Sequence, residues 1–204
     1  MAVDPYLVPL GVTVVETRVS NSRFLSAVTA APSATAAHDF IRERRAADPD
    51  AVHHVYAFRA GYGPSVVEGM SDDGEPSGTS GPPTLAVLRG SGIGDVVLVT
   101  TRYFGGTKLG TGGLVAAYSA AAKAVLAATP TELKVERIDC RISVPYPLLQ
   151  RVQLLLREAE ARMIDESFGD GVELRFRIAR ARQETLAASL RDLSSGRIHI
   201  EIVG

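Results

Sequence analysis

The stretch from Arg102 to Gly113, RYFGGTKLGTGG, combines two cations with five glycines. Glycines let backbone amides approach a ligand, and the start of a following helix offers unpaired N–H groups and a positive dipole end. We interpret the stretch as an anion or nucleic-acid binding site. Its candidate residues are Arg102, Gly105, Gly106, Lys108, Gly110, Gly112 and Gly113. The alternative is a tight turn that requires positive φ and close helix–strand packing. The spacing of the glycines and Lys108 fits neither a Walker loop nor a dinucleotide-binding fingerprint.

An acidic loop, SDDGEPSGTSG from Ser71 to Gly81, is the second segment able to do chemistry. Three carboxylates lie within four residues, and hydroxyls follow them. The functional interpretations are a divalent-cation site or a hydrogen-bonding clamp on a ligand. Hard cations usually need more oxygen ligands than this loop offers, so a structural or ligand-contact role is favoured over a metal. The candidate contacts are Asp72, Asp73, Glu75, Ser77 and Thr79.

His53 and His54 are neighbours on an expected strand from Ala51 to Ala60, so their side chains should point to opposite faces. Each is a candidate ligand contact, with a hydrogen-bonded residue of a partial core as the alternative. No Ser/His/Asp or Cys/His arrangement is readable, so no catalytic residue is assigned. Cys140 lies in an apolar strand and is expected to be inert.

The elements around the glycine-rich stretch can be read from hydrophobic patterns. The run from Asp95 to Thr101 predicts a strand buried on both faces, and an alanine-rich helix is expected from about Leu114 to Ala128. An opening hairpin, a helix to about Ala47 and a short helix from Pro82 to Arg89 complete this part. The break at Thr129-Pro130-Thr131 divides the chain into domains 1–130 and 131–204.

The second part reads as strand, helix, two strands, helix and strand. Its strands are expected at 134–144, 163–168, 172–179 and 198–202, with a helix closed by Gly196 before the last. This βαββαβ order predicts a ferredoxin-like domain, and the whole chain an α+β protein of two domains.

Composition narrows the classes of partner. The net charge is −1, and neither half is a basic block, so any nucleic-acid site must be a local patch. One cysteine and four histidines give no zinc-binding set, and no metal or cofactor is predicted. The start lacks the basic region of a signal peptide, and no apolar run of about 18 residues is evident. We therefore expect a cytoplasmic protein without membrane contact.

Four segments resemble the YigZ/IMPACT family: Ser22-Arg23-Phe24, His53 to Ala57, Ser71 to Gly81, and RYFGGTKLGTGGLVAAYSAA from Arg102 to Ala121. The last two are long and unusual together. The resemblance covers nearly the whole chain, and one departure is Ser80, where alanine is commoner.

The resemblance implies that the first domain is similar to the second domain of small-subunit ribosomal protein five, and the tail to a C-terminal domain of elongation factor G. Eukaryotic relatives regulate translation initiation by contacting the activator of a stress kinase. We expect a translation-linked regulatory or binding protein that contacts RNA or a ribosome-associated partner, rather than an enzyme.

Two alternatives stay open. One is an enzyme acting on a phosphorylated small molecule or nucleotide, with Asp72 or Asp73 as base or ion ligand, although the Gly-Ser-Ser signature of small-molecule kinases is absent. The other is a pure protein-interaction module, in which the two loops form a docking face.

Overall fold

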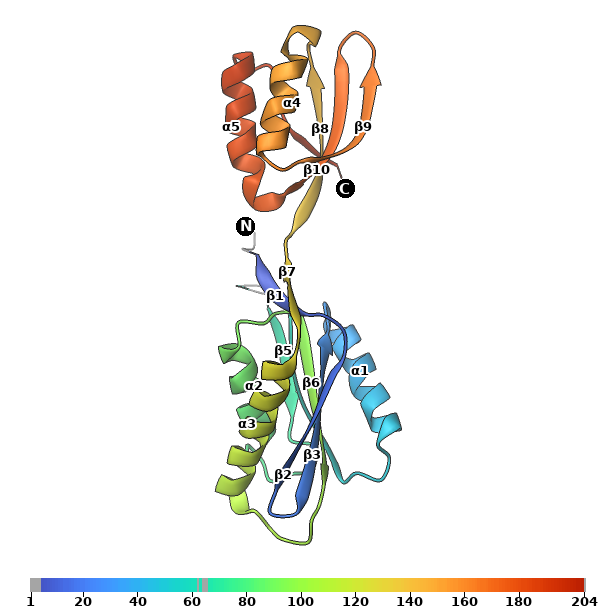
Figure 1. The fold of residues 1–204 in the computed structure, drawn as a ribbon, viewed down its shortest axis with the longest axis vertical. Helices are drawn as coiled ribbons and strands as arrows, with labels where there is room; N and C mark the ends of the chain where they lie inside the picture. The colour runs from blue at the N-terminus through green and yellow to red at the C-terminus, as the bar shows by residue number, and fades with distance from the viewer. Residues whose placement is uncertain (1–4, 62, 64–65, 204) are drawn as a thin grey trace. The chain divides into compact units, whose positions relative to one another are not determined.

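The computed structural model describes residues 5–61, 63 and 66–203. The chain forms two compact units of mixed α and β structure, one from Tyr6 to Lys134 and the other beginning at Val135 (Figure 1). Each unit has its own sheet and its own buried core.

The first unit is built on a five-stranded sheet in which all neighbours are antiparallel. Its strand order is β2 (Thr13–Val19), β3 (Ser22–Ala30), β6 (Val96–Tyr103), β4 (His53–Ala60) and β5 (Val67–Ser71). α1 (Ala34–Ala47) covers one face, and α2 (Gly81–Gly90) and α3 (Gly110–Ala128) cover the other (Figure 1). Because both faces are covered, the central strand β6 is buried from Val96 to Arg102, as its unbroken valine run predicts.

Helix α3 begins at Gly110, four residues before the expected start at Leu114. Glycine costs about 1 kcal/mol relative to alanine inside a helix, but burial of Leu114 and Tyr118 against the sheet outweighs that local preference. α3 is also apolar and long enough, by length and composition alone, to cross a membrane, so the expectation that no such stretch exists was wrong. Its buried face, which includes Val125, packs in the core as a core helix does.

A short ribbon of β1 (Tyr6–Pro9) and β7 (Thr131–Lys134) closes the first unit. Asp95 fixes it: its carboxylate accepts hydrogen bonds from the Tyr6 hydroxyl at 2.8 Å and the Gly61 N–H at 2.7 Å, and pairs with Lys134. Burial acts to raise the pKa of Asp95, but these partners outweigh it and hold that pKa below its ordinary value. The first unit therefore extends to Lys134, four residues beyond the sequence-based boundary at Pro130.

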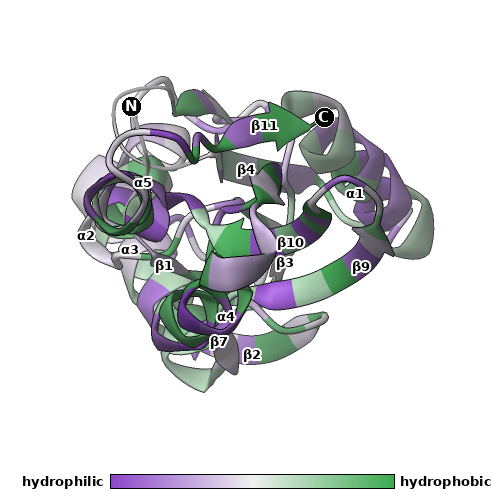
Figure 2. Cartoon of the chain, turned by 90° about the horizontal axis from the view of Figure 1, so that it is seen from above, coloured by the Kyte–Doolittle hydropathy of each residue, from purple (hydrophilic) through white to green (hydrophobic). Residues whose placement is uncertain are grey.

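The second unit has a four-stranded antiparallel sheet in the order β11-β8-β10-β9, the split-βαβ arrangement expected of a ferredoxin-like fold. The elements are β8 (Arg137–Val144), the short helix η2 (Tyr146–Leu148), α4 (Leu149–Glu158), β9 (Arg162–Phe168), β10 (Val172–Ala179), η3 (Arg180–Arg182), α5 (Gln183–Ser194) and β11 (Glu201–Val203). Figure 2 shows that α4 and α5 each carry hydrophobic residues on one side and hydrophilic residues on the other.

The core of this unit lies between the two helices and the inward side chains of β8 and β10, such as Ile142 and Phe176. Ile198 belongs to that core, but strand pairing begins only at Glu201, so the last strand is shorter than its alternation predicts. Cys140 is 1% exposed, and burial raises the pKa of its thiol, which keeps the thiol protonated near neutral pH.

We expect residues 135–204, expressed alone, to unfold cooperatively in urea, because this segment contains a complete sheet and its own core. A fragment beginning at Thr131 should show the same unfolding midpoint, since β7 pairs with β1 of the other unit. Absence of a cooperative transition in both fragments would show that the second unit depends on the first.

Candidate functional site

Three side chains form a row on the face of the sheet that α3 covers. Phe24 of β3 and His53 of β4 both lie directly opposite Arg102 of β6 in the strand register. Directly opposed residues of an antiparallel pair share a face, so the sheet itself brings these side chains together. Phe24 then packs edge-to-face on Tyr118 of α3, with ring centroids 5.2 Å apart.

Glu75 of the acidic loop contacts Arg102 and His53 of this row. Arg102 Nη1 donates to Glu75 Oε1 at 2.6 Å, the Tyr118 hydroxyl donates to the same oxygen at 2.8 Å, and His53 Nε2 lies 3.9 Å from Glu75 Oε2. The side chains of Arg102 and Glu75 are only 7% and 3% exposed. Burial and the neighbouring carboxylate raise the pKa of Tyr118, which therefore stays protonated and donates. We call Glu75, Arg102, Tyr118 and His53 the buried polar cluster.

Arg102 supports the glycine-rich loop from its buried side, through Ser22. Its Nη2 lies 3.4 Å from Ser22 Oγ, which also accepts a hydrogen bond from the Gly105 N–H at 3.3 Å. Its Nε is buried without a hydrogen-bond partner, and its guanidinium carbon lies 5.6 Å from the ring centroid of Phe104. The structure thus pairs Arg102 with Glu75 and does not leave it as an exposed cation.

Asp72 closes the acidic loop on itself. Its carboxylate accepts hydrogen bonds from the N–H groups of Gly78, Ser80 and Gly81 at 2.8–3.0 Å and from Ser80 Oγ at 2.8 Å. Burial acts to raise the pKa of Asp72, but these hydrogen bonds outweigh it and lower that pKa. Asp72 therefore acts as a clamp within the chain.

The two histidines take different roles. The His54 N–H donates to Asp73 Oδ2 at 2.6 Å, and the His54 ring is buried with Nδ1 3.2 Å from Thr101 Oγ1, so burial lowers its pKa. His53 Nδ1 lies 2.8 Å from the carbonyl oxygen of Asp73. A carbonyl only accepts, so His53 Nδ1 carries a hydrogen and Nε2 is directed toward Glu75.

The remaining residues of the acidic loop engage locally. Asp73 forms an ion pair with Arg45 of α1, and Thr79 Oγ1 donates to the Pro76 carbonyl at 2.6 Å, while Ser77 is exposed. Among the described residues, no group of three or more His, Cys, Asp or Glu is placed to hold a metal ion.

The glycines of the loop have separate structural reasons. A Cβ on Gly105 would lie 2.1 Å from the carbonyl carbon of Asn21, so the loop packs directly on the β2–β3 turn. Gly106 and Gly110 have φ of 84° and 71°, which favours glycine. Gly112 has open space around it and no positive φ, and a Cβ on Gly113 would meet only the Leu109 side chain, at 3.1 Å. A tight turn with close packing explains the glycines at 105, 106 and 110. It does not explain Gly112 and Gly113.

The start of α3 lies beside an exposed cation and has no side-chain cap among the described residues. The helix has no side-chain cap at Leu109 and no acidic residue in its first turn. Lys108 is exposed, and within the described part of the chain it has no ion-pair partner. The backbone amides at the start of a helix, its positive dipole end and the Lys108 ammonium group can together bind an anion.

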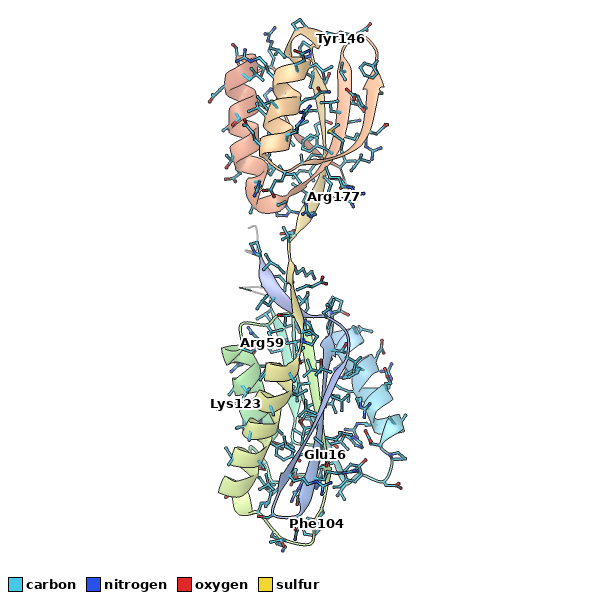
Figure 3. All side chains as sticks on the ribbon, viewed as in Figure 1. Glu16, Arg59, Phe104, Lys123, Tyr146 and Arg177 are labelled. Carbon is cyan, nitrogen blue, oxygen red and sulfur yellow. The ribbon has the colours of Figure 1, made fainter. Side chains whose placement is uncertain are left out.

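The sequence did not single out Ser22, Phe104 or Tyr118. Ser22 and Tyr118 lie within the family-like segments, but neither type nor spacing shows that their hydroxyls converge on Arg102 and Glu75. Phe104 is 53% exposed and lies at the end of the first unit where β2 turns into β3 (Figure 3). An exposed aromatic between cations and glycines is the pattern that could have marked it.

A separate apolar groove of about 740 Å³ runs between α2 and α3. Its walls include Pro83, Val87, Val115 and Leu126, with Lys123 at the same helix surface. Its lining includes none of the buried polar cluster, so this groove and the glycine-rich loop are distinct surfaces of the first unit.

The fold and the cluster define an α+β protein of two units whose glycine-rich loop rests on a buried Arg–Glu pair. Residues 20–126 match the Impact N-terminal domain, and residues 142–197 match a domain of unknown function (DUF1949). The chain belongs to the IMPACT family, as its sequence predicts.

Relatives align along nearly the whole chain. IMPACT family member YigZ of Escherichia coli (strain K12) is 36% identical over 97% of both chains, and an IMPACT family member of Haemophilus influenzae is 35% identical over the same shares. IMPACT family member YvyE of Bacillus subtilis is 31% identical over 90% of this chain and 84% of its own. A crystal structure titled as a hypothetical protein has a TM-score of 0.67 and 33% identity, covering 100% of this chain and 98% of that one.

Proposed function

We propose that this protein is a translation-linked regulatory or binding protein of the cytoplasm that contacts RNA through its glycine-rich loop. The observation that carries the proposal is the uncapped start of α3 beside the exposed Lys108. Family membership supports it, together with the expected likeness of the two units to the second domain of small-subunit ribosomal protein five and to a C-terminal domain of elongation factor G.

The charge distribution supports a local contact. The net charge of −1 excludes a general attraction to polyanions, so affinity must come from a few directed donors. Lys108 supplies the exposed charge. Arg102 is neutralised by Glu75 and instead keeps the loop against the sheet through Ser22. In this proposal Arg102 and the glycines shape the site, and Lys108 with the first amides of α3 contacts phosphate.

We expect Lys108→Ala to weaken RNA binding and to reduce the slope of log affinity against log salt by about 0.7, the value for one phosphate contact on a single strand. Lys123→Ala is the matched control, because it removes the same charge from the far part of α3. Fluorescence anisotropy with labelled RNA at about 50 and 200 mM salt gives both slopes. If Lys108→Ala and the wild type give one slope and one affinity, the loop is structural only.

A second candidate function is a protein-interaction module, which the apolar groove between α2 and α3 favours. Such grooves accept apolar side chains of a partner. This candidate is preferred if the wild type binds no RNA even at low salt, where electrostatic contacts are strongest.

A further inference from the structure

The surface around the glycine-rich loop carries an aromatic ring as well as positive charge. Phe104 follows the last residue of β6 and is 53% exposed, although the strand is buried from Val96 to Arg102 and Tyr103 is half-buried. The neighbouring ring, Tyr103, is already covered, because the Arg23 guanidinium lies 4.0 Å from its centroid. Phe104 therefore remains open at the end of the strand.

Three further cations, Arg18, Arg23 and Lys108, belong to segments at the same end of the first unit as this ring, and Arg18 and Arg23 lie on the face of the sheet opposite to Arg102. The β2–β3 hairpin brings Arg18 and Arg23 to the same end, because Arg23 pairs in register with Tyr103 and the hairpin turn at Asn21 touches Gly105. Lys108 follows in the loop. Glu16 forms ion pairs with the two hairpin arginines, at 2.9 and 3.7 Å, whereas Lys108 has no ion-pair partner among the described residues and is the cation left for a ligand.

Arg102 lies beside the ring. Its guanidinium lies 5.6 Å from the ring centroid of Phe104 and is itself held by Glu75 and Ser22. A cation–π contact to a held guanidinium limits the motion of the ring, which lowers the entropy that the ring loses when a flat group stacks on it.

We propose, building on the proposed function, that the ligand of this loop is a single strand of RNA, one base of which stacks on Phe104 while the adjoining phosphates meet Lys108 and the first amides of α3. Stacking on an exposed aromatic requires an unstacked base, which a duplex does not present. A protein partner would need an apolar surface around the ring, whereas the neighbours here are glycines and cations.

The test compares the full-length wild type with Phe104→Ala and Phe104→Trp, using labelled oligouridine of about 12 nucleotides and a hairpin duplex of similar length. Phe104→Ala should weaken binding of the single strand by about tenfold or more, with an unchanged salt slope because no charge is removed. Phe104→Trp should retain the affinity, and the duplex should bind more weakly than the single strand.

Phe168→Ala is the matched control. Phe168 is 65% exposed on β9 of the second unit, and the stretch around it carries acidic residues rather than cations. Its loss should leave the affinity unchanged. If Phe104→Ala binds as the wild type does while Lys108→Ala is weaker, stacking is wrong and the proposed function stands. If the wild type binds neither the single strand nor the duplex at low salt, both the stacking proposal and the proposed function are wrong.

Discussion

Glu75→Gln should lower the free energy of unfolding of the first unit by about 3–5 kcal/mol, the usual cost of leaving a buried charge without its partner. Glutamine keeps the size of the side chain and an oxygen acceptor for Tyr118, so the change removes the negative charge opposite Arg102 and little else. Arg102 is 5% exposed, and its Nε has no hydrogen-bond partner among the described residues, so little solvent is available to replace the lost charge of Glu75.

Urea unfolding of the full chain measures this loss, with the transition of the second unit as an internal reference. Glu16→Gln is the matched control, because its carboxylate is exposed and paired with Arg18, and such pairs contribute about 1 kcal/mol or less. The double variant Glu75→Gln, Arg102→Met removes both buried charges and should be more stable than Glu75→Gln alone. Equal losses for Glu75→Gln and Glu16→Gln would contradict a buried ion pair.

Gly105→Ala should destabilise the first unit by about 3 kcal/mol, the upper end of the usual cost of overpacking. The new Cβ would lie 2.1 Å from the Asn21 carbonyl carbon and 2.4 Å from the Ser22 nitrogen. These are backbone atoms at the β2–β3 turn and cannot rotate away as a side chain can. The displaced loop should also lose the hydrogen bond from the Gly105 N–H to Ser22 Oγ.

Gly112→Ala is the control for that prediction. Gly112 lies in the first turns of α3 with open space at its Cβ position, so alanine should stabilise the unit by about 0.5–1 kcal/mol. The midpoint of thermal unfolding should therefore fall for Gly105→Ala and hold or rise for Gly112→Ala. A similar shift for both variants would mean that glycine is required along the loop for a reason other than close packing.

Most of the fold follows from the sequence because its patterns are long. β6 with its valine-rich start, and β8 and β10 with their alternation, have eight residues each. β1 and β7 have four residues each, and their pairing depends on a partner far away in the chain, which no local pattern reveals. The start of α3 was placed too late because local glycine preference pointed one way and burial of Leu114 and Tyr118 the other.

The residues of the candidate site were largely predictable from the sequence, but the contacts among them were not. The sequence singled out both loops, and the structure brings Glu75, His53 and Arg102 together. Residue type cannot show whether an arginine at a strand end is exposed or neutralised, because that depends on which carboxylate the fold delivers. The Tyr118 hydroxyl reaches the cluster only because α3 crosses the end of β3.

The β1–β7 ribbon sets an order of events during synthesis. Tyr6 pairs with Lys134, so nearly the whole first unit lies between the two strands. β1 leaves the ribosome early and can bridge to Ile93 through Leu7, but its partner strand β7 is made only as the chain reaches the start of the second unit. Closing so long a loop is slow relative to local contacts. During synthesis the first unit therefore lacks the β1–β7 pairing and the contact of Asp95 with the Lys134 ammonium group, and it becomes complete only as the second unit begins to emerge.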